Sequence, residues 1–319
     1  MSVRPESSPG KVPFIQELPT TEQRNPASAR LDEMGPEEIL RLMNAEDRKV
    51  PDAVEKALPR IAEAVEILVE AWDAGGRWIY VGAGTSGRIA ALDAAECPPT
   101  FGVSPDRVVA LVAGGTTATT KAVENAEDDR EVAKHDLEAV SLSAKDVVVG
   151  LAASGSTPYA VSAVRHAAGA GCPTIGISNN EGTQLSAESR VAIELPTGPE
   201  VLTGSTRLKA GTSQKLVLNM LSTTAFTRLG KIYGNLMVDM QAKNEKLERR
   251  TRRIVSEAAG VSGAEAEGLL FAANGSAKVA VVMGKAGLTA STARTLLDEA
   301  HGNVRLAIEA AEGGGRGRP

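Results

Sequence analysis

The chain has 319 residues and a formal net charge of −5. This acidic balance disfavours nucleic-acid binding, which needs a basic face. No apolar run approaches the roughly 18 residues of a membrane-spanning helix. Residues 1–26 lack the apolar core of a secretory signal, so we expect a cytoplasmic protein without nucleic-acid or membrane partners. Two cysteines and three scattered histidines give neither a disulfide framework nor metal-ligand spacing, and no metal site is expected.

Residues 1–30 are rich in Pro, Ser and Thr, which predicts a disordered or extended arm. From about 35 to 75, apolar residues recur at helical spacing. Five apolar runs of strand length follow, at residues 77–82, 107–115, 146–154, 172–178 and 190–196. Candidate helices separate most of them. Such alternation is typical of βαβ units, in which a parallel sheet is covered by helices on both faces.

The last third of the chain has a different pattern. Residues 205 to about 256 show helical spacing, and after Arg253 short helices alternate with Gly, Asn or Ser breaks. We therefore predict an α/β domain over 31–255, a small all-helical domain over 256–311 and a flexible tail over 312–319. No convincing internal repeat is apparent.

The first predicted strand leads into a glycine-rich loop. Gly82, Gly84 and Gly87 fit G-x-G-x-x-G, which dinucleotide-binding folds use. Such a site also needs a carboxylate at the end of the second strand to bind the ribose, whereas here that strand ends in AGGTT. Thr85 and Ser86 instead place hydroxyls at a helix start, where backbone N–H groups and the helix dipole favour an anion. A phosphate is the better interpretation.

A second loop of the same kind follows the third predicted strand and consists of Ser154, Gly155, Ser156 and Thr157. Hydroxyls can donate to phosphate oxygens without adding a competing charge. Either loop alone is also explained by helix capping, for which Ser and Thr are preferred. Two such loops on neighbouring strands favour a pocket for a small phosphorylated metabolite. No Walker lysine follows either loop, so nothing points to ATP.

Two stretches carry candidate acids. Glu96 ends the helix after the glycine loop, and Pro98 predicts that this helix stops at Cys97. Glu127 lies in an acid-rich stretch whose other members have equal formal claims; they are Glu124, Asp128 and Asp129. Each is also explained as part of a solvated helix face, and spacing alone selects none.

The chain closely resembles the N-acetylmuramic acid 6-phosphate etherase family in four stretches: GAGTSGRIAALDAAECPPTFG, AVENAEDD, LAASGSTPY and the long run from TGPEVLTGSTRLKAGTSQK to MVDMQAKNEKL. The resemblance covers residues 30–310. It implies a sugar isomerase (SIS) fold, a flavodoxin-like parallel sheet with flanking helices, followed by a small helical domain like the ubiquitin-associated type. It also implies cleavage of the lactyl ether to N-acetylglucosamine 6-phosphate and D-lactate, in cell-wall amino sugar catabolism and recycling.

The resemblance further implies site residues. The glutamate of the A-x-E-C-P-P-T motif is the family's proton donor and falls on Glu96, and the second catalytic glutamate falls on Glu127. The family more often has glycine at Asn125. The implied substrate contacts are Ser154, Gly155, Ser156 and Thr157 for the phosphate and Thr85 and Ser86 for the sugar. The roles of Ser205, Thr206 and Lys209 stay open.

The implied reaction is an elimination followed by hydration. A base removes the C2 hydrogen, which lies α to the aldehyde of the ring-opened sugar. An acid protonates the departing ether oxygen at C3, and water then adds at C3. The substrate's own carbonyl accepts the electrons, so no cofactor is implied. Donation near neutral pH predicts that Glu96 is buried, because burial favours the protonated carboxyl.

Helix geometry adds a constraint. If residues 86–96 are regular helix, Glu96 lies on the order of 15 Å from the GTSGR turn, farther than a hexose phosphate extends. Either the phosphate binds mainly at Ser154–Thr157 or a second subunit completes the site, and we expect a homodimer. Two alternatives remain: a phosphosugar aldose–ketose isomerase, which removes the same proton, and a non-catalytic sensor of sugar phosphates. The presence of both glutamates favours the etherase.

Overall fold

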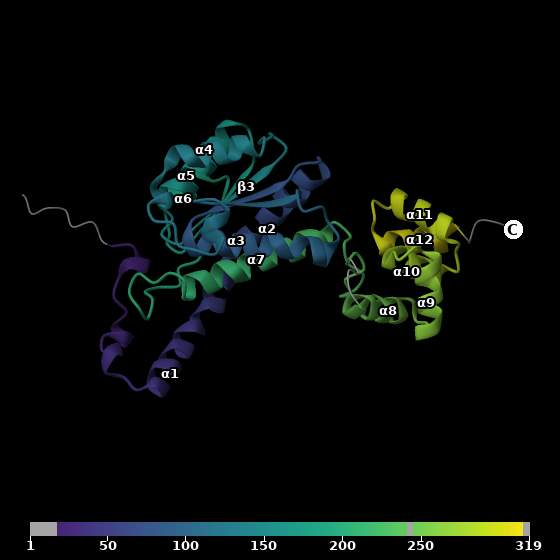
Figure 1. The fold of residues 1–319 in the computed structure, drawn as a ribbon, viewed down its shortest axis with the longest axis horizontal. Coiled ribbons are helices and arrows are strands. Elements are labelled where there is room, and N and C mark those ends of the chain that lie inside the picture. The colour runs from purple at the N-terminus through teal and green to yellow at the C-terminus, as the bar shows by residue number, and fades with distance from the viewer. Residues whose placement is uncertain (1–17, 241–244, 315–319) are drawn as a thin grey trace, which may run out of the picture.

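A five-stranded parallel sheet forms the centre of the larger part of the molecule. The computed structural model of the chain describes residues 18–240 and 245–314 (Figure 1). The strands are β1 (Trp78–Gly82), β2 (Val108–Val112), β3 (Val147–Ala152), β4 (Thr174–Ser178) and β5 (Val191–Glu194). Their order is β2-β1-β3-β4-β5 and every pairing is parallel. All five predicted strands and the flavodoxin-like α/β class are therefore confirmed.

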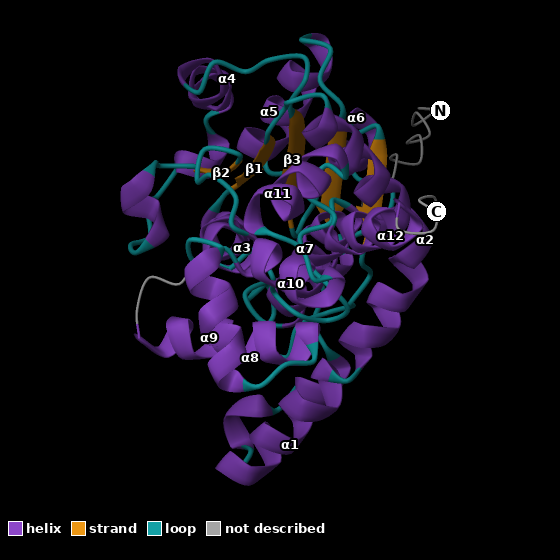
Figure 2. Ribbon diagram, turned by 90° about the vertical axis from the view of Figure 1, so that its right-hand side faces the viewer, coloured by secondary structure: helices purple, strands orange, loops and turns teal. Residues whose placement is uncertain are grey.

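Helices cover both faces of this sheet (Figure 2). One layer contains α2 (Lys49–Asp73), α3 (Gly84–Phe101) and α7 (Lys209–Arg228), and the other contains α4 (Arg130–Ala139), α5 (Pro158–Gly169) and α6 (Gln184–Glu188). Side chains of β1 alternate between the layers, because successive strand residues point to opposite faces: Trp78 and Tyr80 enter one core, Ile79 and Val81 the other. Burial on both faces explains the continuous apolar runs. α1 (Pro36–Asp47) extends away from the sheet (Figure 1).

Helix α3 does not stop where the sequence predicts. It continues through Pro98 to Phe101, so the predicted stop at Cys97 is wrong. Proline disfavours helical geometry in the residue before it, but here tertiary packing outweighs that preference. The Phe101 ring stacks on Phe226 with 4.5 Å between centroids. Gly102, with φ of 65°, then closes the last turn through its N–H to the carbonyl of Pro98.

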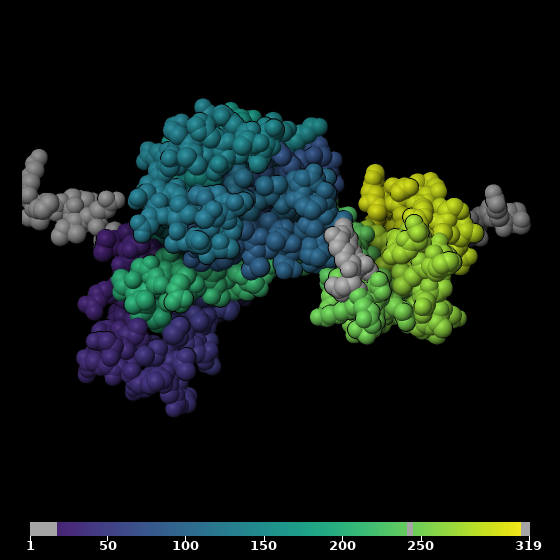
Figure 3. Space-filling model, viewed as in Figure 1, coloured from purple at the N-terminus to yellow at the C-terminus, as the bar shows by residue number. Residues whose placement is uncertain are grey.

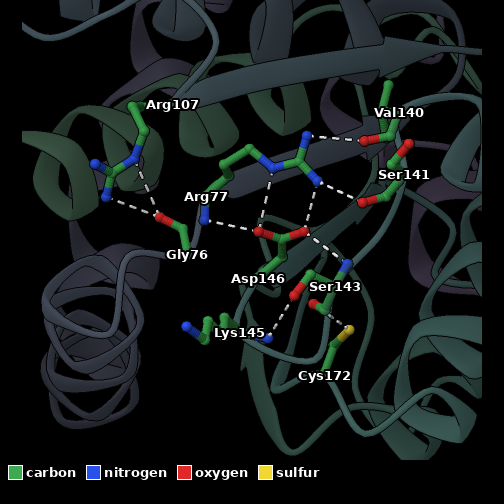
Figure 4. Close-up of polar contacts among 9 residues, drawn as sticks. All are labelled: Gly76, Arg77, Arg107, Val140, Ser141, Ser143, Lys145, Asp146 and Cys172. Atoms are coloured by element: carbon green, nitrogen blue, oxygen red, sulfur yellow. Dashed lines mark hydrogen bonds and ion pairs between the residues drawn. The ribbon is translucent and has the colours of Figure 1, made fainter.

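An ion pair joins the amino ends of β1 and β3 (Figure 4). Arg77 Nη2 lies 2.7 Å from Asp146 Oδ2, and the backbone N–H of Arg77 donates to Oδ1 at 2.8 Å. The same carboxylate accepts from the N–H of Ser143, and Arg77 Nη1 donates to the carbonyl of Val140. Asp146 is 2% exposed. The pair therefore ties β1 to β3 at the end of the sheet opposite the predicted loops.

Part of the predicted N-terminal arm is folded. Residues 1–17 lie outside the described residues, but three short 3-10 turns lie between Thr20 and Glu33. Thr20 Oγ1 donates to Asn180 Oδ1 at 2.7 Å, and Asn25 Nδ2 donates to the carbonyl of Pro199 at 3.1 Å. A disordered or extended state is therefore wrong for this part, because its polar side chains bind the loops that follow β4 and β5.

The C-terminal helices form a second core and a separate lobe (Figure 3). They are α8 (Glu245–Ala259), α9 (Gly263–Ala272), α10 (Ala277–Ala286), α11 (Ala290–Glu299) and α12 (Val304–Gly314). Ile254 and Val255 of α8 belong to this core, as does Val238 before it. The predicted boundary at residue 255 thus falls inside α8. The tail predicted over 312–319 begins within α12, and its residues 315–319 lie outside the described residues.

This lobe contains a repeat that sequence reading missed. Residues 260–283 and 287–310 align without a gap, so α9 corresponds to α11 and α10 to α12. Ser262 and Thr289 cap the corresponding helices. Asn274 and His301, also in corresponding positions, have positive φ angles of 55° and 51°. The expectation of no repeat is therefore wrong. Its identical pairs are only Gly, Ala and Leu, which are common in any helical segment.

Candidate active site

The two hydroxyl loops lie at the carboxyl ends of β1 and β3, which are neighbours in the sheet. Thr85 and Ser86 occupy the first turn of α3, whose N-cap residue, Ala83, provides no side-chain acceptor. Thr157 is the N-cap residue of α5, and its side chain makes no capping hydrogen bond. The capping interpretation therefore does not account for these hydroxyls. The first-turn N–H groups lack side-chain caps, which favours an anion at this edge.

Close backbone contact explains the glycine pattern. A Cβ added at Gly87 would lie 2.6 Å from the carbonyl oxygen of Gly82, and one added at Gly82 would lie 2.9 Å from the nitrogen of Gly87. Neither position has room for a side chain. The glycines thus permit a tight strand-to-helix turn, a requirement that does not depend on a dinucleotide.

The loop after β3 is held by its own hydroxyls and by a neighbouring loop. The N–H and Oγ of Ser156 both donate to Ser154 Oγ at 3.1 Å. Asn180 Nδ2 donates to the carbonyl of Ser154 at 3.2 Å. Gly155 has a φ of 71°, and a Cβ there would lie 2.4 Å from Thr183. The loop is therefore compact, while Ser156 stays exposed to solvent.

Glu127 faces a cleft of about 450 Å³ beside the glycine loop. The lining residues are Ala83, Gly84, Thr85, Arg88, Ala113, Ala118 and 122–127. Glu127 lies on a 3-10 turn, Ala126–Asp128, rather than on a long helix. Asn125 before it has a φ of 60°. This left-handed conformation favours glycine and is tolerated by asparagine, which explains why either residue serves there.

The structure separates the neighbouring acids. The side chain of Asp129 accepts from the N–H groups of Glu131 and Val132, so Asp129 caps α4. Asp128 does not line the cleft, whereas Glu124 does. The choice among the four acids is thereby reduced to Glu124 and Glu127.

Glu96 lies apart from this cleft. It is exposed on α3 and does not line the cavity, so its expected burial is wrong for the single chain. Helix α3 is continuous from Thr85 to Glu96, which at about 1.5 Å per residue places the two about 16 Å apart along the helix. The chain thus brings Thr85 and Glu127 together but not Glu96. Ser154, Ser156 and Thr157 also lie outside the cleft lining.

Asp93, one turn before Glu96, is a buried acid that no sequence pattern singles out. It is 5% exposed. Its Oδ1 accepts from Asn219 Nδ2 at 2.9 Å and from Ser222 Oγ at 3.1 Å, and its Oδ2 accepts from the Tyr80 hydroxyl at 3.2 Å. Burial raises the pKa of this carboxyl, and the three hydrogen bonds oppose that rise. Asp93 therefore joins α3 to α7 beneath the predicted proton donor.

Lys209, whose role was left open, has a structural contact. Its Nζ donates to Glu46 Oε2 at 2.6 Å, and it is 1% exposed. The carboxylate of Glu200 accepts from the backbone N–H groups of Lys209 and Ala210, at 3.1 and 2.9 Å, and so caps α7. A Cβ added at Gly211 would lie 3.5 Å from Thr85. The start of α7 is thus held against the glycine loop.

Comparison with known proteins identifies the fold and the family. Residues 60–168 match the glucokinase regulatory protein N-terminal SIS domain, and residues 117–224 match the SIS domain. The chain is 56% identical to the N-acetylmuramic acid 6-phosphate etherases of Mycolicibacterium smegmatis and Serratia proteamaculans. Each alignment spans 263 residues, which is 82% of this chain and 88% and 89% of the two relatives, respectively. The Geobacillus thermodenitrificans etherase is 55% identical, with 89% covered. In the described part of the chain, no helix is long and apolar enough to cross a membrane. The chain belongs to the N-acetylmuramic acid 6-phosphate etherase family.

Proposed function

We propose that the cleft beside the glycine loop is the sugar site at which this chain cleaves the lactyl ether of N-acetylmuramic acid 6-phosphate. The products are N-acetylglucosamine 6-phosphate and D-lactate. The observation that carries the assignment is that Thr85 and Glu127 line one cavity at the carboxyl end of β1, where parallel α/β folds bind ligands. Its volume of about 450 Å³ suits a small metabolite. Because sugar phosphates are intracellular metabolites, we place the reaction in the cytoplasm.

The phosphate is assigned to the loop after β3. Ser154, Ser156 and Thr157 supply hydroxyl donors, and the α5 N-terminus adds backbone N–H groups and a favourable dipole. Thr85 and Ser86 then lie beside the sugar ring. This arrangement binds the anion without a cation from the loop itself.

Glu127 is assigned as the base and Glu96 as the acid. Glu127 takes the C2 proton of the open-chain sugar, and the electron pair of that bond forms a C1–C2 enolate. The enolate then expels the C3 oxygen, to which Glu96 gives its proton, so lactate leaves as the free hydroxy acid. Water adds at C3 to restore the hydroxyl. Each positioned acid or base contributes about 10²- to 10⁴-fold to such reactions.

In this proposal, Glu96 reaches the cleft from a second copy of the chain. Glu96 is exposed on α3, and Leu92, one turn earlier, is 52% exposed. An apolar side chain beside an exposed acid favours a contact surface at this part of α3. In a homodimer formed there, Glu96 of one chain would meet Glu127 of the other, and burial in the interface would favour the protonated acid.

Isotope labelling tests the reaction. In water enriched in oxygen-18, elimination and hydration place the label on the C3 oxygen of N-acetylglucosamine 6-phosphate and leave lactate unlabelled. Label in the lactate would instead mean attack at the lactyl carbon. Absence of lactate would favour the isomerase or the sensor.

Paired variants test the shared site. Glu96→Gln and Glu127→Gln are expected to be inactive alone. A heterodimer of the two, isolated with different affinity tags, carries one intact site and is expected to recover about half of the wild-type activity. A heterodimer at background would mean that each chain supplies both glutamates.

A further inference from the structure

Arg88 is the one cation among the described residues that line the cleft. It lies on α3, one turn after Thr85, and is half-buried. Its Nη2 donates to the carbonyl of Lys121 at 3.1 Å, and this is its only hydrogen bond to the described chain. No carboxylate of the described residues lies within ion-pair distance. The guanidinium is therefore held by the loop that carries Glu127, while most of its donors are unused.

The charges around this guanidinium indicate what it binds. A guanidinium presents five N–H donors in a planar fork that matches a carboxylate through two parallel bonds. The other charged residues of the cleft are Glu124 and Glu127, both negative. Glu124 and Glu127 repel an anionic ligand in this cleft, and Arg88 is the group that can offset this repulsion.

The substrate carries two anions at opposite ends. Its phosphate, on C6, is assigned to the hydroxyl loop after β3. Its lactyl carboxylate hangs from the C3 oxygen, next to the C2 proton that Glu127 removes. Because Glu127 and Arg88 line the same cleft, the second anion falls in the cavity that contains Arg88.

We propose that Arg88 binds the lactyl carboxylate and so selects sugars whose C3 ether carries an acid. The inference rests on the proposed assignment of this cleft as the sugar site. The Lys121 carbonyl engages one N–H group of the guanidinium, and the other N–H groups make no hydrogen bond to the described residues. Arg88 is thus a specificity-determining residue, and the proton transfers remain with the glutamates.

The experiment compares two ethers and one product. The ethers are N-acetylmuramic acid 6-phosphate and its lactamide, in which a neutral amide replaces the carboxylate. The product, N-acetylglucosamine 6-phosphate, serves as a competitive inhibitor that lacks the lactyl group. For Arg88→Met we expect kcat/KM for the acid to fall roughly 10- to 100-fold, mainly through KM. The lactamide kcat/KM and the product inhibition constant should stay unchanged.

Arg88→Lys keeps the charge but not the fork, so its loss should be intermediate. Arg165→Met is the matched control, because it removes an exposed arginine paired with Glu188 outside the cleft. It should behave as wild type.

Three outcomes would overturn the proposal. An equal loss on acid and lactamide would mean that Arg88 only holds the loop. A weaker product inhibition would assign Arg88 to the phosphate. Unchanged kinetics in Arg88→Met would show that Arg88 does not bind the lactyl carboxylate. If Glu127→Gln still abolished lactate release, the assignment of the cleft as the sugar site would stand without the role of Arg88.

Discussion

Lys209 and Glu46 form a buried ion pair, with 2.6 Å between Nζ and Oε2, that joins the first turn of α7 to the end of α1. The second oxygen of Glu46 accepts from Lys49 Nζ, also at 2.6 Å. Glu46 is 4% exposed and Lys209 is 1% exposed. Because the same turn of α7 packs against Thr85, this pair links the stability of the fold to the shape of the glycine loop.

Lys209→Met should destabilise the protein strongly, because it leaves a buried carboxylate with one partner. Removal of one partner of a buried pair costs about 3–5 kcal/mol. The double variant Glu46→Leu/Lys209→Met should recover most of the loss, since no charge stays buried. Urea denaturation of both variants checks this. A double variant as unstable as the single one would show that packing, rather than charge, dominates.

The Arg77–Asp146 pair should make stability depend on acid pH. Burial raises the pKa of Asp146, but hydrogen bonds from Arg77 and Ser143 outweigh it and hold the pKa below its usual value. The stabilisation is therefore complete above the unfolded value of about 3.9 and is lost as pH falls below it. Asp146→Asn should be less stable than wild type at pH 7, and the difference should shrink below pH 4. A stability difference between Asp146→Asn and wild type that does not change with pH would contradict the lowered pKa of Asp146.

Asp93 should behave in the opposite sense. Since burial raises its pKa, the folded state holds the proton more tightly than the unfolded chain. Its contribution to stability therefore falls as pH rises above about 3.9. Asp93→Asn keeps the acceptor for Asn219 and Ser222, and it should be more stable than wild type at pH 8, with the difference shrinking below pH 4. Thermal unfolding at pH 8 measures this. Asp93→Ala is the comparison, because it leaves the three donors without a partner and should destabilise.

Gly155→Ala should weaken substrate binding, because the new methyl group would meet Thr183 and displace the loop that we propose binds the phosphate. Gly182→Ala is the control. Gly182 has a similar φ of 62° but open space where the methyl group would lie. Both variants bear backbone strain of about 1 kcal/mol, so only Gly155→Ala should also raise KM, by tenfold or more. Equal KM values in the two variants would contradict the assignment of this loop to the phosphate.

The parts of the fold that follow local pattern could be predicted from the sequence. Strands β1, β3 and β4 are buried on both faces, so their apolar runs are visible in the sequence, and the Thr85 and Ser154 loops follow two of these runs. Contacts between distant residues could not be predicted. Nothing near Lys209 indicates Glu46, and nothing near Asp93 indicates Asn219. The stop at Cys97 failed for the same reason, since Phe226 lies far along the chain.

Glu96 marks a further limit. Its motif assigned a role to it, but the single chain leaves it away from the cleft. A site of the proposed kind, to which two copies of the chain contribute, cannot be located from the spacing within one sequence.

The repeat in the C-terminal lobe has a consequence for how this part of the molecule can change. Helix α10 packs against the four other helices of the lobe, α8, α9, α11 and α12. It therefore ends one three-helix unit and begins the next, as in proteins whose stability is a sum of neighbouring units. Such a lobe is modular. We therefore expect that a further helix pair inserted after Gly287 would pack on α10, as α11 and α12 do.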